Sequence, residues 1–182
     1  MKMLVHRTPG SVAQPFDLDD LKLHLRASED AEDAAIANIG QTAAAEIEHF
    51  AQIALLTQTV LVTIFDPGQD CGLSLPIGPM ADDETPTVTI DGTAFTAFDV
   101  VSGVRPYLRW QDAYHDLTPR QVTIEYQAGF GATATDIPYD LAQALMDQAA
   151  LHYDGRSPMD AKSLTTSPHM ARIGARYRGV QV

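Results

Sequence analysis

The side chains best suited to chemistry in this sequence are one Glu-x-x-His pair and several histidines on separate predicted elements. Glu46 and His49 match half of the motif that holds di-metal centres in carboxylate-bridged helical bundles. Such a centre needs a second copy of the motif and two more carboxylates, and the sequence has no second copy. His24, His115 and His152 stand on other elements, and the sequence alone does not decide whether they converge in the fold. We interpret the Glu46–His49 pair as part of a solvated helix face.

The remaining short motifs each lack something that their chemistry needs. The segment Gly129-Phe-Gly-Ala-Thr133 precedes a predicted helix without the Lys-Ser/Thr pair of a phosphate loop, so it predicts a turn. The acidic residues 82–84 do not have the spacing of a Ca²⁺ loop. Ser74 and Ser102 lack a Gly-x-Ser-x-Gly elbow, and no signature of a nucleophile surrounds Cys71. The sequence therefore predicts no catalytic residue, no metal ligand and no cofactor.

Three stretches have the pattern of amphipathic helices, over residues 17–26, 29–52 and 138–153. Asp17 is a suitable N-cap for the first stretch. Acidic residues open the second stretch, where they interact favourably with the helix dipole. Pro138 stands at the start of the third stretch, a position that proline favours.

Between residues 56 and 130 the pattern changes to short strands. β-branched residues fill 57–65, and residues 121–127 alternate apolar with polar side chains. Asp91-Gly92 joins two further strands as a hairpin. The order is therefore two helices, about six short strands and one helix. Because helices and strands occur in runs rather than in strict alternation, the sequence predicts an α+β fold.

The charge of the chain is divided unevenly along its length. Its 182 residues include 24 acidic and 12 basic side chains, a formal net charge of −12. Residues 1–154 hold 23 of the acids and 7 of the bases, a net charge of −16. Residues 155–182 hold one acid and five bases, a net charge of +4. So acidic a body argues against a broad surface that grips nucleic acid.

The last residues, 157–182, contain few large apolar side chains, and this composition predicts an extended C-terminal arm. A frayed terminus is the plain interpretation of such an arm. The functional interpretation is a basic segment that becomes ordered when it docks on a partner. Arginine and tyrosine anchor many protein interfaces, so the candidate contacts are Arg172, Arg176, Tyr177 and Arg178.

The compartment follows from three features of composition. A single cysteine cannot form an internal disulfide, which suits a reducing compartment. The first 15 residues lack the apolar run of a signal peptide. No stretch is long and apolar enough to span a membrane. We therefore expect a protein made in the cytoplasm that does not bind membranes.

Five phrases, read in order, resemble the head–tail connector (adaptor) family of long-tailed bacteriophages and gene transfer agents. They extend over residues 16–156, and Phe130 replaces the family's usual tyrosine. The phrases are the helix and acidic start at 18–33, Leu-Leu-Thr-Gln-Thr at 55–59, Leu-Ser-Leu-Pro-Ile-Gly-Pro at 73–79, the strand ending in Ala-Gly-Phe-Gly at 122–131, and Ile-Pro with a helix ending in His-Tyr-Asp-Gly-Arg at 137–156.

The resemblance implies an N-terminal segment (1–15), a connector domain (16–156) and the basic arm (157–182). The domain would be a helical bundle, made of two N-terminal helices and a C-terminal helix, with a β-rich insertion at 56–130. Such proteins form a ring, typically of twelve subunits, at the head–tail junction of a virion or phage-like particle assembled in the bacterial cytoplasm. They have no catalytic site and need no cofactor.

The implied partners are the portal protein, a stopper or other tail-side connector, and further copies of the chain. The ring would extend the DNA channel and dock the next tail component, while DNA passes through without specific binding. Negative walls repel DNA phosphates, which helps the genome slide. The candidate channel-facing acids are Glu29, Asp30, Glu32 and Asp33, and the arm residues named above are the candidate portal contacts.

Two other functions are compatible with the sequence. A stopper or tail-completion protein of the same particle would also form a ring, but such proteins are mainly β, which the leading pair of helices disfavours. A small cytoplasmic enzyme with an α+β fold would need polar groups that converge in a closed pocket.

Overall fold

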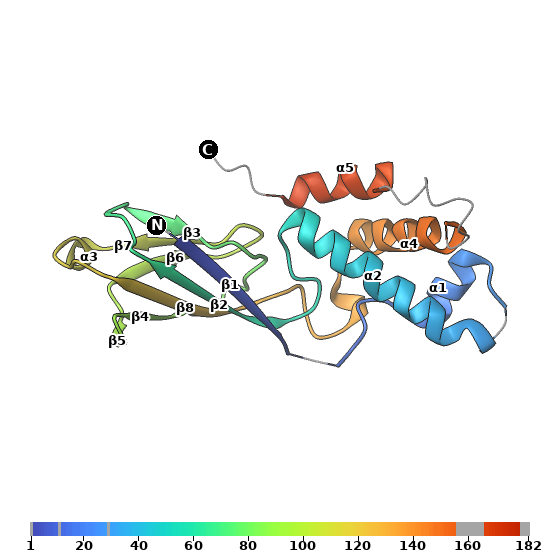
Figure 1. Ribbon diagram of the computed structural model, residues 1–182, viewed down its shortest axis with the longest axis horizontal. Coiled ribbons are helices and arrows are strands. Elements are labelled where there is room, and N and C mark those ends of the chain that lie inside the picture. The colour runs from blue at the N-terminus through green and yellow to red at the C-terminus, as the bar shows by residue number, and fades with distance from the viewer. Residues whose placement is uncertain (1, 11, 29, 156–165, 179–182) are drawn as a thin grey trace. The chain divides into compact units, whose positions relative to one another are not determined.

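The computed structural model describes residues 2–10, 12–28, 30–155 and 166–178 (Figure 1). The chain forms two compact units, and each of them is built from two separate stretches of sequence. The β unit comprises Met1–Ser11 and Thr57–Phe130. The helical unit comprises Val12–Leu56 and Gly131–Val182.

A five-stranded antiparallel sheet is the centre of the β unit. Its strand order is β1 (Lys2–Pro9), β2 (Gln58–Phe65), β8 (Gln121–Ala128), β4 (Thr87–Ile90) and β5 (Thr93–Phe95). One face of the sheet is apolar, and its central strands bury every second residue. These buried residues are Val60, Val62 and Ile64 of β2 and Val122, Ile124 and Tyr126 of β8. Burial on one face fixes the register, because a slip of one residue would turn this whole set outward.

A smaller sheet completes the β unit. It contains β3 (Gly72–Ser74), β7 (Tyr107–Trp110) and β6 (Phe98–Val101), in that order, and the short helix α3 (Asp112–His115) follows β7. Trp110 and Tyr114 stack with their ring centroids 4.4 Å apart. Phe95, at the end of β5, meets both rings edge-on at 6.0 and 6.2 Å. This aromatic cluster joins the end of the large sheet to the small one.

The helical unit contains α1 (Leu18–Leu25), α2 (Asp33–Ala51), α4 (Tyr139–Asp154) and α5 (Pro168–Tyr177), with short 3₁₀ turns at Asp30–Glu32 and Ala134–Asp136. Figure 1 shows α2 and α4 side by side, and α5 packs against both of them. Ile36 and Ile47 of α2 and Leu141 and Leu145 of α4 are almost fully buried. Among the described residues, no helix has both the length and the apolar character of a membrane span.

The first helix is set by its cap and by one close contact. The Asp17 carboxylate accepts hydrogen bonds from the backbone N–H groups of Asp19 and Asp20, at 2.9 and 3.1 Å. Phe16 lies against Gly40 of α2, where a Cβ atom would come within 2.5 Å of the phenyl ring. The glycine therefore allows the start of α1 to pack directly on α2.

The predicted α+β class is confirmed. The predicted helices 17–26 and 138–153 differ from α1 and α4 by one residue at each end. The helix predicted from residue 29 begins later, because residues 30–32 form a 3₁₀ turn and α2 starts at Asp33. The sequence predicts no strand within residues 1–15, where β1 lies. β1 has no alternating pattern of its own. Its position is determined by pairing with all eight residues of β2.

The C-terminal residues differ from the expected extended arm. Residues 156–165 and 179–182 lie outside the described ranges, but Pro168–Tyr177 forms a helix packed on α2 and α4. Met170, Ile173 and Gly174 are buried in this contact. The overall composition of residues 157–182 concealed a short apolar stripe, because one helix of ten residues needs only two or three apolar side chains to dock on a neighbour.

One buried hydroxyl in the β unit generates a test of the sheet packing. Tyr126 is 1% exposed, and its hydroxyl donates to the Ile77 carbonyl at 2.9 Å and accepts from the Ile77 N–H at 3.2 Å. Burial raises the pKa of this hydroxyl, which keeps the proton in place for donation. Both backbone groups of Ile77 therefore depend on a single side-chain oxygen.

We predict that Tyr126→Phe lowers the free energy of unfolding by about 1–3 kcal/mol, because it leaves two buried polar groups without a partner. Urea denaturation of the full chain measures the change. Tyr139→Phe is the matched control, since Tyr139 is 93% exposed. Equal stabilities of the two variants would contradict the assigned hydrogen bonds.

Candidate interaction surface

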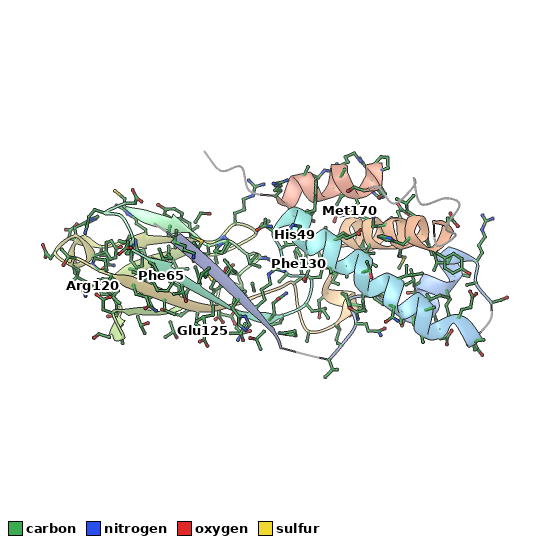
Figure 2. The ribbon with its side chains drawn as sticks, in the orientation of Figure 1. His49, Phe65, Arg120, Glu125, Phe130 and Met170 are labelled. Carbon is green, nitrogen blue, oxygen red and sulfur yellow. The ribbon has the colours of Figure 1, made fainter. Side chains whose placement is uncertain are left out.

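The start of α5 is specified by two adjacent residues. Ser167 is the N-cap, and its Oγ accepts a hydrogen bond from the Met170 N–H at 3.0 Å. Pro168 occupies the first turn, where its missing N–H costs nothing. Met170 then points into the unit from the first turn of the helix (Figure 2). A serine followed by proline therefore begins a helix at this point, although the surrounding composition is typical of an arm.

In the middle of α5, the helix backbone packs closely against a side chain of α2. Gly174 faces Phe50, and a Cβ atom at this glycine would come within 2.6 Å of the Phe50 ring. Arg178 follows the helix and places its guanidinium carbon 5.6 Å from the centre of the same ring. Phe50 thus contacts both the backbone and a cation of the C-terminal segment.

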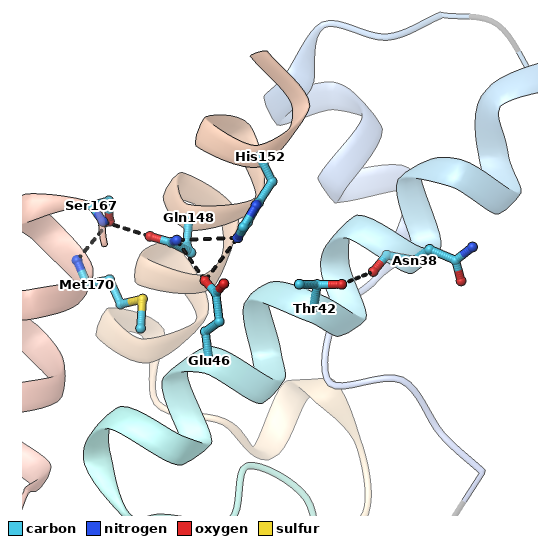
Figure 3. A network of polar contacts seen from close by, with 7 residues as sticks. All are labelled: Asn38, Thr42, Glu46, Gln148, His152, Ser167 and Met170. Atoms are coloured by element: carbon cyan, nitrogen blue, oxygen red, sulfur yellow. Dashed lines mark hydrogen bonds and ion pairs between the residues drawn. The ribbon is translucent and has the colours of Figure 1, made fainter. Parts of the chain in front are cut away.

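A polar network joins α2, α4 and the start of α5 (Figure 3). Gln148 of α4 is 2% exposed. Its amide nitrogen donates to Glu46 at 2.7 Å, and its oxygen accepts from the backbone N–H of Ser167 at 2.7 Å. His152 Nε2 lies 2.9 Å from the same Glu46 oxygen. One buried amide therefore links the three helices and satisfies an N–H group that no helix could satisfy.

A second cluster lies one residue earlier on α4. The carboxylate of Asp147 has His24 Nε2 at 3.3 Å on one oxygen and His169 Nδ1 at 2.5 Å on the other. Gln143 also donates to it, at 2.9 Å. These groups come from α1, α4 and α5, so Asp147 holds both flanking helices to α4. The two histidines give the cluster a positive charge only when they are protonated.

Of the four predicted arm contacts, Arg172 lies in the middle of α5, Arg176 and Tyr177 lie at its end, and Arg178 follows it. The Tyr177 hydroxyl donates to Asp140 of α4 at 3.0 Å, and Arg176 Nη1 lies 4.0 Å from the same carboxylate. Arg178 lies over Phe50, as described above. Arg172 is exposed. Three of the four side chains therefore anchor the helix, while Arg172, Arg176 and Arg178 keep exposed surface and make it basic.

The predicted channel acids hold the start of α2. Glu29 lies outside the described residues. Lys22 of α1 pairs with Asp30 at 2.8 Å and with Asp33 at 2.6 Å. The two carboxylates raise the pKa of Lys22, and Lys22 lowers the pKa of Asp30. Glu32 accepts a hydrogen bond from the Tyr153 hydroxyl at 2.8 Å.

The residues first considered for chemistry do not form a reactive centre. Glu46 contacts Gln148 and His152, which are not the partners that a di-metal centre would require. His49 is exposed on α2 (Figure 2). Within the described ranges, no three His, Cys, Asp or Glu side chains gather so as to hold a metal ion. Cys71 is exposed. Of these residues, Glu46 makes contacts within the fold, with Gln148 and His152.

Sequence reasoning missed Gln148 and Asp147, although one signal was present. In the helix predicted over 138–153, Leu141, Leu145 and Ala149 form an apolar stripe, and Gln148 falls on it. A polar residue on a buried stripe needs a partner. Asp147 carries no comparable signal, because both of its histidine partners lie on other helices.

The β unit has a shallow groove of about 560 Å³ beside β5, an edge strand of its large sheet. Its apolar lining comes from Ile90, Phe95, Ala113 and Leu117, with Asp91 at the rim. Leu117 is 37% exposed there. The lining holds no cluster of titratable groups of the kind that an active site needs.

The comparison with solved structures found a chain in gene transfer agent (GTA) particles. A chain in the virion of a native GTA particle is 26% identical, with a TM-score of 0.76, over 98% of this chain and 97% of that one. Chains in the neck of an empty particle computed with C6 symmetry, and in the neck of a native particle computed with C12 symmetry, are each 25% identical at the same TM-score and coverage. No protein-family model and no curated protein matches the sequence.

The matched chains share nearly their whole length with this one, including both the β unit and the helical unit. This protein therefore has the fold of a structural component of GTA particles. The similarity to the GTA chains includes the C-terminal part of the chain. The sequence resemblance to the connector family ends at residue 156 and does not include that part.

The contact between Tyr177 and Asp140 generates a pH-dependent test. Burial, and then the hydrogen bond to Asp140, raises the pKa of Tyr177 to about 12, from an ordinary value of 10.0. A raised pKa means that the hydroxyl contributes fully to stability below pH 10 and loses this contribution as the pH rises towards 12.

We predict that the wild-type chain is more stable than Tyr177→Phe at pH 8, and that this advantage shrinks at pH 11. Urea denaturation of both chains at the two pH values measures it. The comparison removes the effect of other alkaline titrations, since both chains share them. An advantage that is equal at pH 8 and pH 11 would show that the Tyr177 hydroxyl does not bind Asp140 in the folded state.

Proposed function

We propose that this protein is a head–tail connector (adaptor) that forms a ring beneath the capsid portal of a phage-like particle. The observation that carries the proposal is the similarity, over 98% of the chain, to chains in the necks of GTA particles. The C6 and C12 symmetries of those necks agree with a ring of twelve copies. The protein would act at the head–tail junction of the particle after assembly in the bacterial cytoplasm.

The charge of the body supports a role as a DNA conduit. Residues 1–154 have a net charge of −16, and acidic walls repel phosphate at short range. Lys22 neutralises only one of its two partners, so the start of α2 stays negative after Lys22, Asp30 and Asp33 have paired. We propose that Glu29, Asp30, Glu32 and Asp33 face the channel, and that DNA passes without specific contacts.

The basic end of α5 supports a contact with the portal. It is an anchored helix rather than a loose arm, so less conformational entropy is lost when it docks. Arg172, Arg176 and Arg178 are exposed on a protein that is otherwise acidic, which suits an acidic patch on the partner. Twelve copies in a ring would bind with high avidity. The other rim of the ring would dock a stopper or another tail-side connector.

Because α5 is anchored to α2 and α4, deletion of the C-terminal segment is not a suitable test of the portal contact. Deletion of residues 157–182 would uncover Phe50 and leave Gln148 without its partner at Ser167, so loss of binding would not be separable from unfolding. Reversal of the charges of Arg172 and Arg176 leaves the apolar contacts of α5 in place, although it removes the 4.0 Å pair of Arg176 with Asp140.

We predict that the double variant Arg172→Glu, Arg176→Glu binds the portal protein at least about tenfold more weakly than the wild type, because it places like charges in the contact. Pull-down on the portal protein of the same kind of particle measures binding, and urea denaturation checks the fold. Arg26→Glu, an exposed charge reversal in the same unit, is the control.

Unchanged portal binding by the double variant would rule out α5 as the portal contact. A wild-type chain that binds the tail-side connector but never the portal would favour the stopper over the adaptor.

A further inference from the structure

The two edge strands of the large sheet in the β unit differ in length and in their surroundings. In the described part of the chain, β1 forms one edge and β5 the other (Figure 1). β1 is eight residues long, and its Leu4 and Val5 are 49% and 42% exposed. A long exposed edge with apolar side chains pairs readily with another strand unless something covers it. The edge at β5 is short and lies beside the groove lined by Phe95 and Leu117.

The register places particular residues of the two edges at the same level. Following pairs across the sheet, Leu4 lies opposite Thr63, Thr63 opposite Thr123, Thr123 opposite Thr89, and Thr89 opposite Ala94. The next row runs in the same way from Val5 to Phe95. Leu4 and Ala94 therefore share one face of the sheet, and Val5 and Phe95 share the other.

The groove fits the side chain that this register brings to it. Phe95 and Ile90 line the groove, and both lie on the face of the sheet that Val5 also occupies. If the β1 edge of a second copy joined β5, its Val5 would stand beside Phe95 at the groove. Two partly exposed apolar sites would then cover each other.

The charges at the two edges are complementary. β1 contains Lys2, His6 and Arg7 and no acidic residue. Lys2 lies opposite Phe65, Phe65 opposite Gln121, and the Gln121 carbonyl accepts from the N–H of Asp91. Asp91 is exposed in the turn between β4 and β5, where its carboxylate also accepts hydrogen bonds from the backbone N–H groups of Arg120 and Gln121 at 3.1 and 2.8 Å, so Lys2 at one edge and this acidic turn at the other stand at the same level of the sheet.

From these observations we propose that neighbouring copies join edge to edge, with β1 of one copy beside β5 of the next. The inference rests on the proposed function, because it assigns the contact that closes the ring. A cyclic ring needs two different, complementary patches on each subunit, and the two edges supply them. In an all-antiparallel sheet of five strands the first and fifth point the same way, so rotation about an axis along the strands makes the junction parallel.

The size of the resulting ring is reasonable for a connector. Five strands at about 4.8 Å spacing add about 24 Å per copy. Twelve copies give a circumference of about 290 Å and a diameter of about 90 Å, which leaves room for a central channel. The sheets would form a continuous band without exposed edges, which is how barrels avoid aggregation.

Cysteine cross-linking tests the junction at the level that the register fixes. In a Cys71→Ser background, Leu4→Cys and Ala94→Cys chains are mixed and oxidised mildly, both as concentrated free protein and after assembly with the portal. Adjacent strands are about 4.8 Å apart, within the Cα separation of a disulfide. We expect the mixture to form disulfide-linked dimers at least about tenfold faster than either chain alone, because the ring holds the pair at high effective concentration.

Val101→Cys is the matched control, because Val101 is 59% exposed on a strand of the small sheet. Cross-linking of Leu4→Cys with Ala94→Cys at the rate seen with Val101→Cys would overturn the junction. Leu4→Cys dimers that form as fast as the mixed dimers would also overturn it, in favour of a symmetric contact. If a ring assembles on the portal without the expected cross-link, the connector function stands and only the junction is wrong. If no ring assembles, the connector function fails. The cross-linking experiment on the concentrated free protein then still decides whether the two edges meet.

Discussion

The buried amide of Gln148 is the contact on which the helical unit depends. It donates to Glu46 of α2 and accepts from the first backbone N–H of the α5 cap, so one side chain joins α2, α4 and α5. Buried polar groups of this kind are costly unless every partner is present, and here each partner is present. The result is a C-terminal helix that packs on α2 and α4. The basic surface at the end of that helix is therefore presented by the fold, not by a loose tail.

Charge is divided between the parts of the molecule in a way that matches this architecture. Most acidic residues belong to the body, and several of them hold helices together rather than face solvent alone. Asp147 binds two histidines, Asp140 receives Tyr177 and Arg176, and Asp30 and Asp33 share Lys22. The cations at the end of α5 remain exposed beside these pairs. In a connector, such a division would keep DNA moving through the ring while one helix makes the protein contact.

Much of the fold could be predicted from the sequence, because its signals are local. Alternation in residues 121–127 and the β-branched run at 57–65 mark the two central strands, and Asp17 and Pro138 mark helix starts. The remaining features needed tertiary contacts. β1 is placed by pairing with β2, and α5 is docked by Gly174 against Phe50. β1 has no alternating pattern of its own, and the short apolar stripe of α5, with Ser167 and Pro168 at its start, is concealed by a composition typical of an arm.

The candidate site was predictable only in part, for the same reason. Basic composition drew attention to Arg172, Arg176, Tyr177 and Arg178, of which the first three belong to α5 and Arg178 follows it. Their anchoring by Asp140 and Phe50 could not be predicted, since it joins residues far apart in the chain. The central claim, a ring that stacks on the portal, is tested most directly by native mass measurement of this protein mixed with its portal. The account predicts a single complex that contains twelve copies of this chain for each portal ring. Free portal together with an unassembled connector chain would contradict it.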